Sequence, residues 1–350
     1  MSRRQVSRWL VVLAVLHALI LCAGFFAPND PEEQDRERPY LAPVKIHFVD
    51  SQGHFHLRPF VYPTRLQTGS FDQFEEDDST PLPLRFVVTG PRYRLLGFIP
   101  CRRHLFGTDG ARLYLLGSDA YGRDLFTRIL YGGQISLLAG LLGATITLSL
   151  GAGIGAIAGY YGGWRDAVLM RTAELFVALP WLYLLFGLRA FLPLTVGPLE
   201  AFFLVVTVIG AVGWARPARL VRGVVLSVKE RDFVRAARGF GASNRYLLFR
   251  HILPQTSSVL LTQAALLVPQ FVLAEMTLSF LGLGVPEPVP SWGNLLASLQ
   301  QYSVLISYWW MYLPALSVVP FFLGYLGLAS ALQEGRGAGK MEEAPGGSPL

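Results

Sequence analysis

Three ionisable residues lie within or beside long apolar stretches of this chain, where a charged side chain is costly to hold. They are Glu174, Arg189 and Glu275. Side chains of this type can line a polar path across a membrane or pair with groups on neighbouring helices. For Glu174 and Arg189 a plainer interpretation is also open, because either could reach the membrane surface at a helix end. Glu275 lies deeper in its stretch, and contact with a transported molecule or only with an adjacent helix are both open.

A compact basic segment, residues 235–254, reads RAARGFGASNRYLLFRHILP and lies between two apolar runs. Its alanines favour helix, Gly241 breaks a helix, Ser243 can cap a second short helix, and Pro254 is expected to end it. This pattern predicts two short helices bent at a glycine, with a mixed apolar and basic surface suited to a soluble partner. A plain loop whose arginines only set membrane topology is the alternative.

Motifs for catalysis or metal binding are weak in this sequence. His47, His54 and His56 lie near each other, and His54 and His56 would share a strand face, but no cysteine or paired carboxylate completes a metal set. Surface histidines on a hairpin are the favoured interpretation. No serine or cysteine stands in a nucleophile context, so we expect no catalytic residues and no metal site.

Glycines at positions 151, 153 and 155, followed by Ala158, imitate a dinucleotide-binding fingerprint. They lie inside an apolar run with no strand before it, which argues against nucleotide binding. The spacing of Gly151, Gly155 and Gly159 favours close packing between helices. No phosphate-binding cluster of glycine, lysine and serine occurs in the sequence. We therefore expect no cofactor on this chain.

The elements that must position these residues are membrane helices. Apolar residues make up 52% of the 350 positions and charged residues 15%, with a mean hydropathy of +0.40, a balance that indicates a polytopic membrane protein in contact with lipid. The net charge of +6 comes from arginines beside apolar runs, which argues against nucleic-acid binding. Six apolar runs can span a bilayer: 9–26, 135–160, 173–192, 201–215, 259–283 and 305–332.

Orientation follows from the short flanking segments. Arg3, Arg4 and Arg8 precede the first run and acidic residues follow it, so the amino terminus is expected in the cytoplasm, and six crossings return the carboxy terminus there. A cleavable signal peptide is the alternative for the first run. Cys22 and Cys101 are expected on opposite sides, without a disulfide.

Residues 28–134 form an extracytoplasmic insertion and lead-in. Segments 45–49 and 54–62 alternate in polarity around a turn and predict a hairpin, and 84–88 is a further strand candidate. Residues 67–83 are acidic and rich in turn formers, which predicts a loop. The expected fold is an all-α polytopic membrane protein with about six transmembrane helices and a small β-rich extracytoplasmic insertion after the first helix.

Four segments carry a family resemblance. Arg235-Ala236-Ala237, then Gly241, then Leu253-Pro254, resembles the cytoplasmic coupling loop of ABC transporter permease subunits that work with a solute-binding protein. GSDAYGRDLFTRILYGGQISL from Gly117, LSFLGLG from Leu278 and PSWGNLL from Pro290 are similar to the dipeptide, oligopeptide and nickel branch. With Asp166, Met170, Arg171, Glu174 and Pro180, the resemblance covers most of 117–332. One departure is Arg235, since the family usually has glutamate there.

The resemblance implies a domain organisation and a set of partners. Together with the hydropathy pattern, it divides the chain into an N-terminal cytoplasmic tail and first membrane helix (1–27), the insertion and lead-in (28–134), the permease core (135–333) with its coupling loop (216–254), and a flexible tail (334–350). Residues 36–101 of the insertion are not part of the common core of the family. The implied partners are a second permease subunit, expected as a different chain in a heterodimer, two ATPase subunits or domains that bind ATP, and an extracytoplasmic solute-binding protein. Residues Arg235, Ala236, Ala237, Gly241, Leu253 and Pro254 inherit the ATPase-coupling role.

Two classes of function follow from these features. The first is the permease subunit of an ATP-driven importer of short peptides or related solutes in the bacterial inner membrane; nickel, oligosaccharides and peptide-like antibiotics are open alternatives. The second is a membrane-anchored enzyme or receptor whose extracytoplasmic domain carries the activity. Residues 235–254 favour the first class, because an enzyme has no need for that loop.

Overall fold

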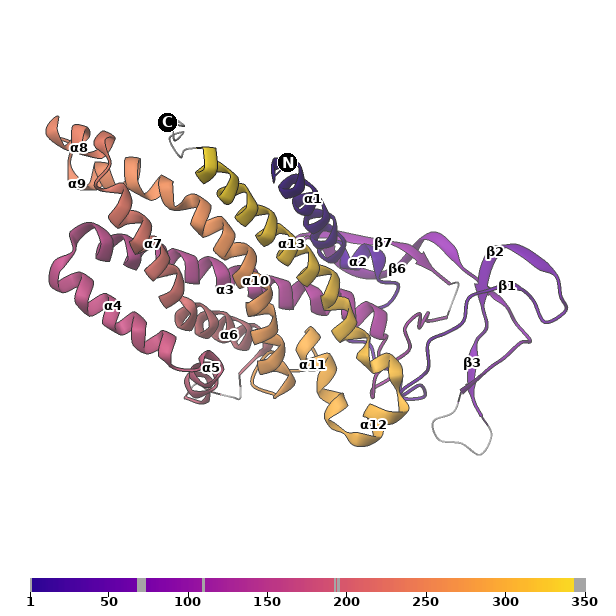
Figure 1. Ribbon diagram of the computed structural model, residues 1–350. Helices are drawn as coiled ribbons and strands as arrows, with labels where there is room; N and C mark the ends of the chain where they lie inside the picture. Colours follow the sequence, from indigo (N-terminus) through magenta and orange to yellow (C-terminus); the bar gives the residue numbers. More distant parts are fainter. Residues whose placement is uncertain (1, 68–73, 109–110, 192, 194–195, 343–350) are drawn as a thin grey trace, which may run out of the picture. The chain divides into compact units, whose positions relative to one another are not determined.

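The computed structural model describes residues 2–67, 74–108, 111–191, 193 and 196–342 (Figure 1). They fold into two compact units, each continuous in space but not in sequence. Unit 1 comprises Met1–Leu13, Leu137–Glu275 and Pro320–Leu350, and unit 2 comprises Ala14–Ser136 and Met276–Val319. The long helices α1 (Ser2–Leu21), α3 (Leu125–Tyr161), α10 (Ser257–Phe280) and α13 (Leu313–Glu342) contribute residues to both.

Four helical stretches are each long and apolar enough to cross a membrane within the described part of the chain. Two bent helix pairs raise the number to six if each pair makes one crossing: α4 (Gly163–Ala178) with α5 (Trp181–Ala190), and α6 (Pro198–Gly213) with α7 (Ala215–Val228). The prediction of a mostly helical protein with about six spans and a small β region is therefore confirmed.

The third and fourth spans differ from simple rods. The sequence predicts one helix over residues 173–192, but the chain bends by 95° between α4 and α5. Pro180 causes this break, since it has no backbone N–H to continue α4 and it holds Leu179 in an extended conformation. Helix α6 ends at Gly213, two residues before the predicted end of the fourth run at 215, and the chain then continues as α7 after a bend of only 44°.

Other helix boundaries also differ from the sequence-based prediction. Helix α3 begins at Leu125, ten residues before the expected start, because the polar residues 117–124 form its lead-in turn. The last candidate span begins at Trp309, four residues after the expected start at 305. Its main helix α13 begins at Leu313, after the short helices α12 (Tyr302–Ser307) and η4 (Trp309–Tyr312). Helix α13 extends to Glu342, so it continues into the segment assigned to a flexible tail; residues 343–350 lie outside the described residues.

The insertion of unit 2 is β-rich, as predicted. Strand β1 (His47–Val49) pairs antiparallel with β2 (Phe55–Val61), which confirms the first hairpin. The strand predicted at 84–88 is longer, β6 (Arg85–Leu95), and pairs with β7 (Ile99–Gly107). The prediction of a plain loop at 67–83 is wrong in part, because this segment contains two short strands. Strand β4 (Phe74–Glu76) pairs with β3 (Thr64–Leu66), and β5 (Leu82–Pro83) pairs with β2. Residues 68–73 lie outside the described part of the chain.

Unit 2 has a second structured region around the start of α3. Leu125 and Ile129 pack with Trp310 and Met311 in a hydrophobic cluster completed by Leu295 and Val304. The short helices α11 (Trp292–Leu296) and η3 (Ala297–Gln300) contribute to this cluster, and Ser291 caps α11 by accepting a hydrogen bond from the Asn294 amide. The short helix α2 (Ala23–Phe26) follows α1 and contacts strands β6 and β7.

Unit 1 is held together by close helix packing on glycines. A Cβ at Gly155 would overlap the carbonyl oxygen of Ala218, and Cβ atoms at Gly151 and Gly159 would press on Pro217 and Val225. All three partners belong to α7, so the glycines of α3 let α7 approach its backbone, as their spacing predicts. This packing fixes the helix that leads into the basic segment.

Candidate functional site: the elbow segment and its cavity

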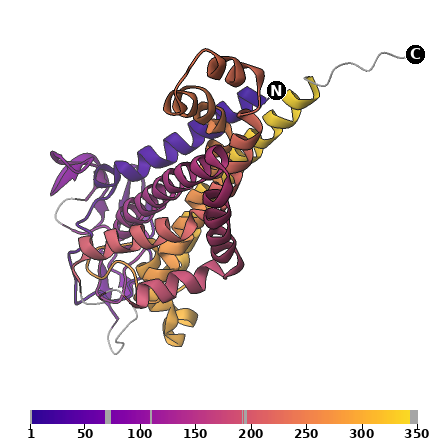
Figure 2. The same cartoon turned by 90° about the vertical axis from the view of Figure 1, so that its left-hand side faces the viewer.

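Residues 232–256, here called the elbow segment, follow α7 and form a bent chain of short helices. They are α8 (Asp232–Gly239), α9 (Asn244–Tyr246), the π-helical turn η1 (Leu247–Ile252) and the 3-10 turn η2 (Leu253–Thr256). Both views place α8 and α9 at one end of unit 1 (Figures 1 and 2). The two short helices predicted from the sequence are confirmed.

Gly241 makes the bend between α8 and α9. Its φ is +84°, in the left-handed region that glycine adopts without strain. The amide of Gly241 donates to the carbonyl of Arg238 at 3.0 Å and that of Ala242 to Ala237 at 3.1 Å, which closes the end of α8. Ser243 then caps α9 by accepting a hydrogen bond from the Tyr246 amide at 3.3 Å.

Pro254 does not end the helical run, contrary to expectation. It lies in the first turn of η2, and the chain continues directly into α10. A proline is tolerated at this position because the first amides of a helical turn have no partner within it. The elbow segment is therefore joined without a break to a membrane helix.

The inner face of the elbow segment is apolar. Val234, Leu247 and Ile252 are fully buried and pack against Val221 and Val225 of α7. Ala237 and Leu253, two of the predicted coupling residues, lie partly buried against the same cluster. Burying one such aliphatic side chain contributes about 1.5–3 kcal/mol, so the elbow segment is fixed on α7 and is not a loose loop.

Two polar contacts join the end of α3 to the elbow segment and to the end of α7. The hydroxyl of Tyr160, at the end of α3, donates to the amide oxygen of Asn244 at 2.7 Å, and Lys229 donates to the carbonyl of Gly159 at 3.1 Å. Arg235 pairs with Glu230 at 3.3 Å, and both side chains are about two thirds exposed (63% and 62%). The charge of Arg235 is thus offset locally by a residue of the preceding turn.

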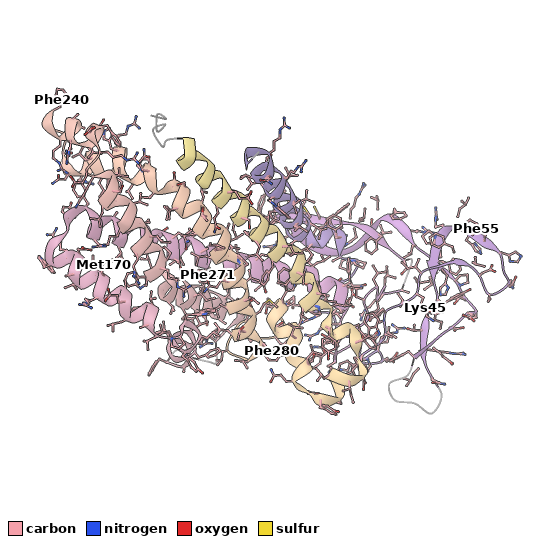
Figure 3. The ribbon with its side chains drawn as sticks, viewed as in Figure 1. Lys45, Phe55, Met170, Phe240, Phe271 and Phe280 are labelled. Atoms are coloured by element: carbon pink, nitrogen blue, oxygen red, sulfur yellow. The ribbon has the colours of Figure 1, made fainter. Side chains whose placement is uncertain are left out.

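The outer face of the elbow segment exposes large aromatic side chains. Phe240 is 92% exposed and Phe249 is 64% exposed, with Tyr246 and Phe233 also on the surface. Figure 3 shows Phe240 at the outer tip of the elbow segment. Arg238, Arg245 and Arg250 complete the basic character of this surface. Aromatic and arginine side chains are the types that dominate protein interfaces.

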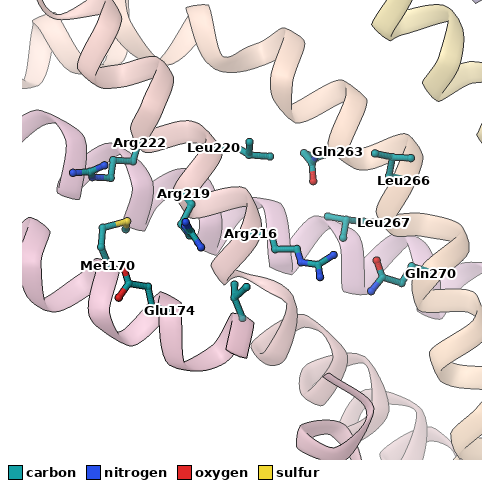
Figure 4. A pocket seen from close by; sticks show the side chains of 11 residues that line it. Met170, Glu174, Arg216, Arg219, Leu220, Arg222, Gln263, Leu266, Leu267 and Gln270 are labelled. Carbon is teal, nitrogen blue, oxygen red and sulfur yellow. The ribbon is translucent and has the colours of Figure 1, made fainter. Parts of the chain in front are cut away.

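A cavity of about 750 Å³ lies between α4, α7 and α10 of unit 1 (Figure 4). Glu174 and Met170 enter it from α4, and three arginines enter it from α7: Arg216, Arg219 and Arg222. Helix α10 supplies Gln263 and Gln270, and Figure 4 shows Arg216 extending toward Gln270. A second cavity of about 220 Å³ shares Val177, Arg216, Leu267 and Gln270 with the first and is lined mainly by apolar side chains.

Ion pairs reduce the charge at this cavity. Arg222 binds Asp166 through two hydrogen bonds, of 2.5 and 2.6 Å, that join α7 to α4. Such bidentate pairs are the stronger type of ionic contact. Glu174 accepts a hydrogen bond from Arg171 at 3.0 Å. Arg216 and Arg219 supply the remaining positive charge of the lining.

The three predicted pathway residues do not meet at one place. Glu174 lines the cavity, whereas Glu275 and Arg189 are fully buried and absent from the lining of both cavities. Arg189 donates to the carbonyl oxygen of Pro193 at 2.9 Å. Their pathway role stays a prediction.

Sequence reasoning missed most of the cavity lining. It explains Arg216, Arg219 and Arg222 as topology determinants at the start of the predicted coupling loop 216–254, although their three-residue spacing places them on one helix face. Gln263 and Gln270, seven residues apart inside an apolar run, likewise share a face. A search for polar residues at helical spacing within the apolar runs would have found both sets.

In unit 2, the segment that starts at Gly117 forms an ionic network of buried arginines and a half-exposed glutamate. Arg123 and Arg128 both bind the carboxylate of Glu287, at 2.7 and 2.8 Å, and Arg123 also binds Asp119 at 2.7 Å. Arg128 is completely buried. Asp124 caps the start of α3, and burial raises its pKa to about 6. These residues tie the loop around Glu287 to the start of α3.

The histidines of the insertion pair with carboxylates. His47 lies 3.1 Å from Glu76, and His56 lies 2.9 Å from Asp50 and lowers the pKa of that carboxyl. Within the described residues, no group of three histidine, cysteine or acidic side chains is arranged to hold a metal ion.

Comparison with known proteins identifies the family. Residues 151–335, more than half of the chain, match the binding-protein-dependent transport system inner membrane component. The chain belongs to this family. The matched region contains the elbow segment and both cavities, and it places this family member in the inner membrane as a multi-pass transport component.

Individual relatives agree with this assignment. A candidate peptide permease protein of Brucella suis is 38% identical over 61% of this chain and 66% of its own length. The oligopeptide transport system permease protein OppC of Haemophilus influenzae is 38% identical over 61% of this chain and 67% of its own. The dipeptide transport system permease protein DppC of Alkalihalophilus pseudofirmus is 33% identical over 71% and 76%. The matches thus span about two thirds to three quarters of these relatives.

Proposed function

We propose that this chain is one of two permease subunits in an ATP-driven importer of short peptides or related solutes delivered by a solute-binding protein. The names of its relatives support the substrate class, since those proteins are peptide permeases. The ATP would be bound and hydrolysed by two partner ATPase subunits or domains. Both termini of this chain and the elbow segment would face the cytoplasm.

The observation that carries the proposal is the two-sided elbow segment. Its inner face is locked to α7 by Val234, Leu247 and Ile252, while its outer face presents Phe240 and Phe249. A soluble partner that holds these rings would act directly on α7 and, through the unbroken connection, on α10. Helices α7 and α10 both line the cavity, so a movement of the elbow segment would change the shape of the cavity.

The cavity supports a polar solute. Peptides carry a carboxylate and many backbone carbonyls, which match the arginines of α7 and the glutamines of α10. Glu174 would face the opposite charge of a peptide amino group. Glu275 and Arg189 would not contact the solute directly. They would instead hold α10 and α5 in position around the cavity.

Copurification tests the proposed contact. The ATPase subunits should copurify with the wild-type chain and be lost from a variant carrying Phe240→Ser and Phe249→Ser. Tyr302→Ser is the matched control, because Tyr302 is an aromatic residue of unit 2 whose exposure (75%) lies between those of Phe240 and Phe249. Retention of the ATPase by the double variant, with an intact chain, would contradict a contact at the elbow segment.

A further inference from the structure

The β6–β7 hairpin of the insertion has a basic body and an apolar tip. Between Ser79 and Thr108 the sequence has five arginines and no acidic residue. Residues 95–100 at the turn read LLGFIP, and three of them are well exposed: Leu96 at 48%, Phe98 at 72% and Ile99 at 42%. The hairpin lies outside the region that matches the family.

The two faces of the hairpin differ in polarity. Tyr93 pairs with Cys101 and Leu95 pairs with Ile99, which places these four side chains on one face. Arg94 pairs with Pro100 on the other face, which Arg102 shares by alternation, and Arg92 precedes Tyr93 at the end of a stretch where the register shifts. All three arginines are exposed, and none forms an ion pair with any residue in the described part of the chain.

The hairpin lies against α2, the short helix that follows the first membrane helix. The ring of Tyr93 covers Gly24 so closely that a Cβ there would overlap it, and Nδ1 of His104 lies 2.6 Å from the carbonyl oxygen of Ala27. Both views show β6 and β7 beside α2 (Figures 1 and 2).

The order of these contacts gives the direction of the hairpin. From His104 to Tyr93 the hairpin approaches its tip, while the contacted position moves from Ala27 to Gly24, back toward α1. The tip therefore points along α1 toward its apolar span, where Leu19 and Leu21 are exposed. Backbone hydrogen bonds within the turn satisfy the amides of Gly97 and Phe98, which lowers the cost of moving these two donors out of water.

We propose that the tip of this hairpin, residues 95–100, inserts into the lipid interface at the end of α1, and that Arg92, Arg94 and Arg102 bind anionic phosphate headgroups. An exposed apolar tip next to a membrane span and a ring of arginines are the features of an interfacial anchor. The anchor would hold the insertion at the membrane surface. It does not depend on which solute is transported.

Spin labelling of the full-length chain in vesicles tests the insertion. With Cys22→Ala and Cys101→Ala as the background, a nitroxide is placed at Phe98→Cys, and at Leu96→Cys as a second tip position. The reference label is at Gln52→Cys, an exposed turn residue between β1 and β2. In vesicles of phosphatidylcholine and phosphatidylglycerol, the ratio of oxygen to nickel-chelate collisions should be several-fold higher at the tip than at position 52.

Two outcomes would overturn the proposal. Nickel collisions at the tip as frequent as at position 52 would place the tip in water, and exclusion of both oxygen and nickel would place it against protein. The headgroup contact has its own test. If the arginines bind anionic headgroups, phosphatidylglycerol should raise the ratio of oxygen to nickel-chelate collisions at the tip. Arg92→Gln, Arg94→Gln and Arg102→Gln together should remove this rise. A collision ratio that is identical with and without phosphatidylglycerol, in the labelled chain that keeps all three arginines, would contradict the role of the arginines.

Discussion

Gly241 offers the sharpest test of the elbow segment, because its φ of +84° can be compared directly with what other residues tolerate. An alanine in the left-handed region costs about 1–2 kcal/mol. A Cβ at position 241 would meet no atom within 4 Å, so no steric clash adds to this cost. Gly241→Ala should therefore shift the equilibrium between bent and unbent elbow by about 5- to 30-fold.

Gly241→Pro should have a larger effect. The proline ring holds φ near −65° and removes the N–H that Gly241 donates to Arg238. The bend would then be lost, while the apolar core on α7 keeps the chain folded in the membrane. Measured in proteoliposomes with the partner subunits, transport per ATP hydrolysed should fall moderately in Gly241→Ala and almost completely in Gly241→Pro.

The matched control is Gly223→Ala on α7. A Cβ at position 223 would also meet no atom within 4 Å, but the backbone there is helical, so alanine should stabilise it by about 0.5–1 kcal/mol. This variant should couple normally. The reasoning fails if Gly241→Pro inserts, assembles and transports with the wild-type ratio of solute to ATP.

Three further variants test the packing and the electrostatics. Gly155→Ala should destabilise unit 1 by about 1–3 kcal/mol in a thermal melt, because its Cβ would overlap the Ala218 carbonyl, whereas Gly153→Ala, which meets nothing, should not. Asp166→Asn should lower the free energy of unfolding by about 1–3 kcal/mol, because it removes the charged partner of Arg222. The double variant with Asp166→Arg and Arg222→Asp should recover part of this stability. No recovery in the double variant would contradict a direct ion pair. Burial raises the pKa of Asp124 to about 6, so the folded state binds the proton of this carboxyl more tightly than the unfolded state does. The free energy of unfolding should therefore fall by about 3 kcal/mol between pH 4 and pH 6 and then level off. Asp124→Asn should remove this pH-dependent step, and a step that is unchanged in the variant would refute the assignment to Asp124.

The sequence predicted the elements of this protein better than their ends. Hydropathy located the spans because a run of apolar residues must be helical in lipid, and Gly241 and Ser243 marked the bend because their conformational preferences are local. The break at Pro180 and the continuation beyond Pro254 differ from the prediction, since the effect of a proline depends on whether it falls inside a helix or in its first turn.

The cavity could not be assembled from the sequence alone. Glu174, Glu275 and Arg189 stood out because each is a charge in an apolar setting, yet only Glu174 lines the cavity. Which buried charge faces a cavity depends on how α4, α7 and α10 pack, and that packing follows from contacts between residues far apart in the chain. The partner of Arg222, Asp166, is 56 residues away for the same reason.

Solute uptake into proteoliposomes tests the central claim most directly. Vesicles would contain the partner permease and the ATPase subunits, with ATP inside and the solute-binding protein and a labelled short peptide outside, and this chain would be either present or omitted. The proposed function predicts ATP-dependent accumulation of the peptide only when this chain is present. Equal accumulation without it, or ATP-independent accumulation with it, would contradict the assignment of this chain as a permease subunit of an ATP-driven importer.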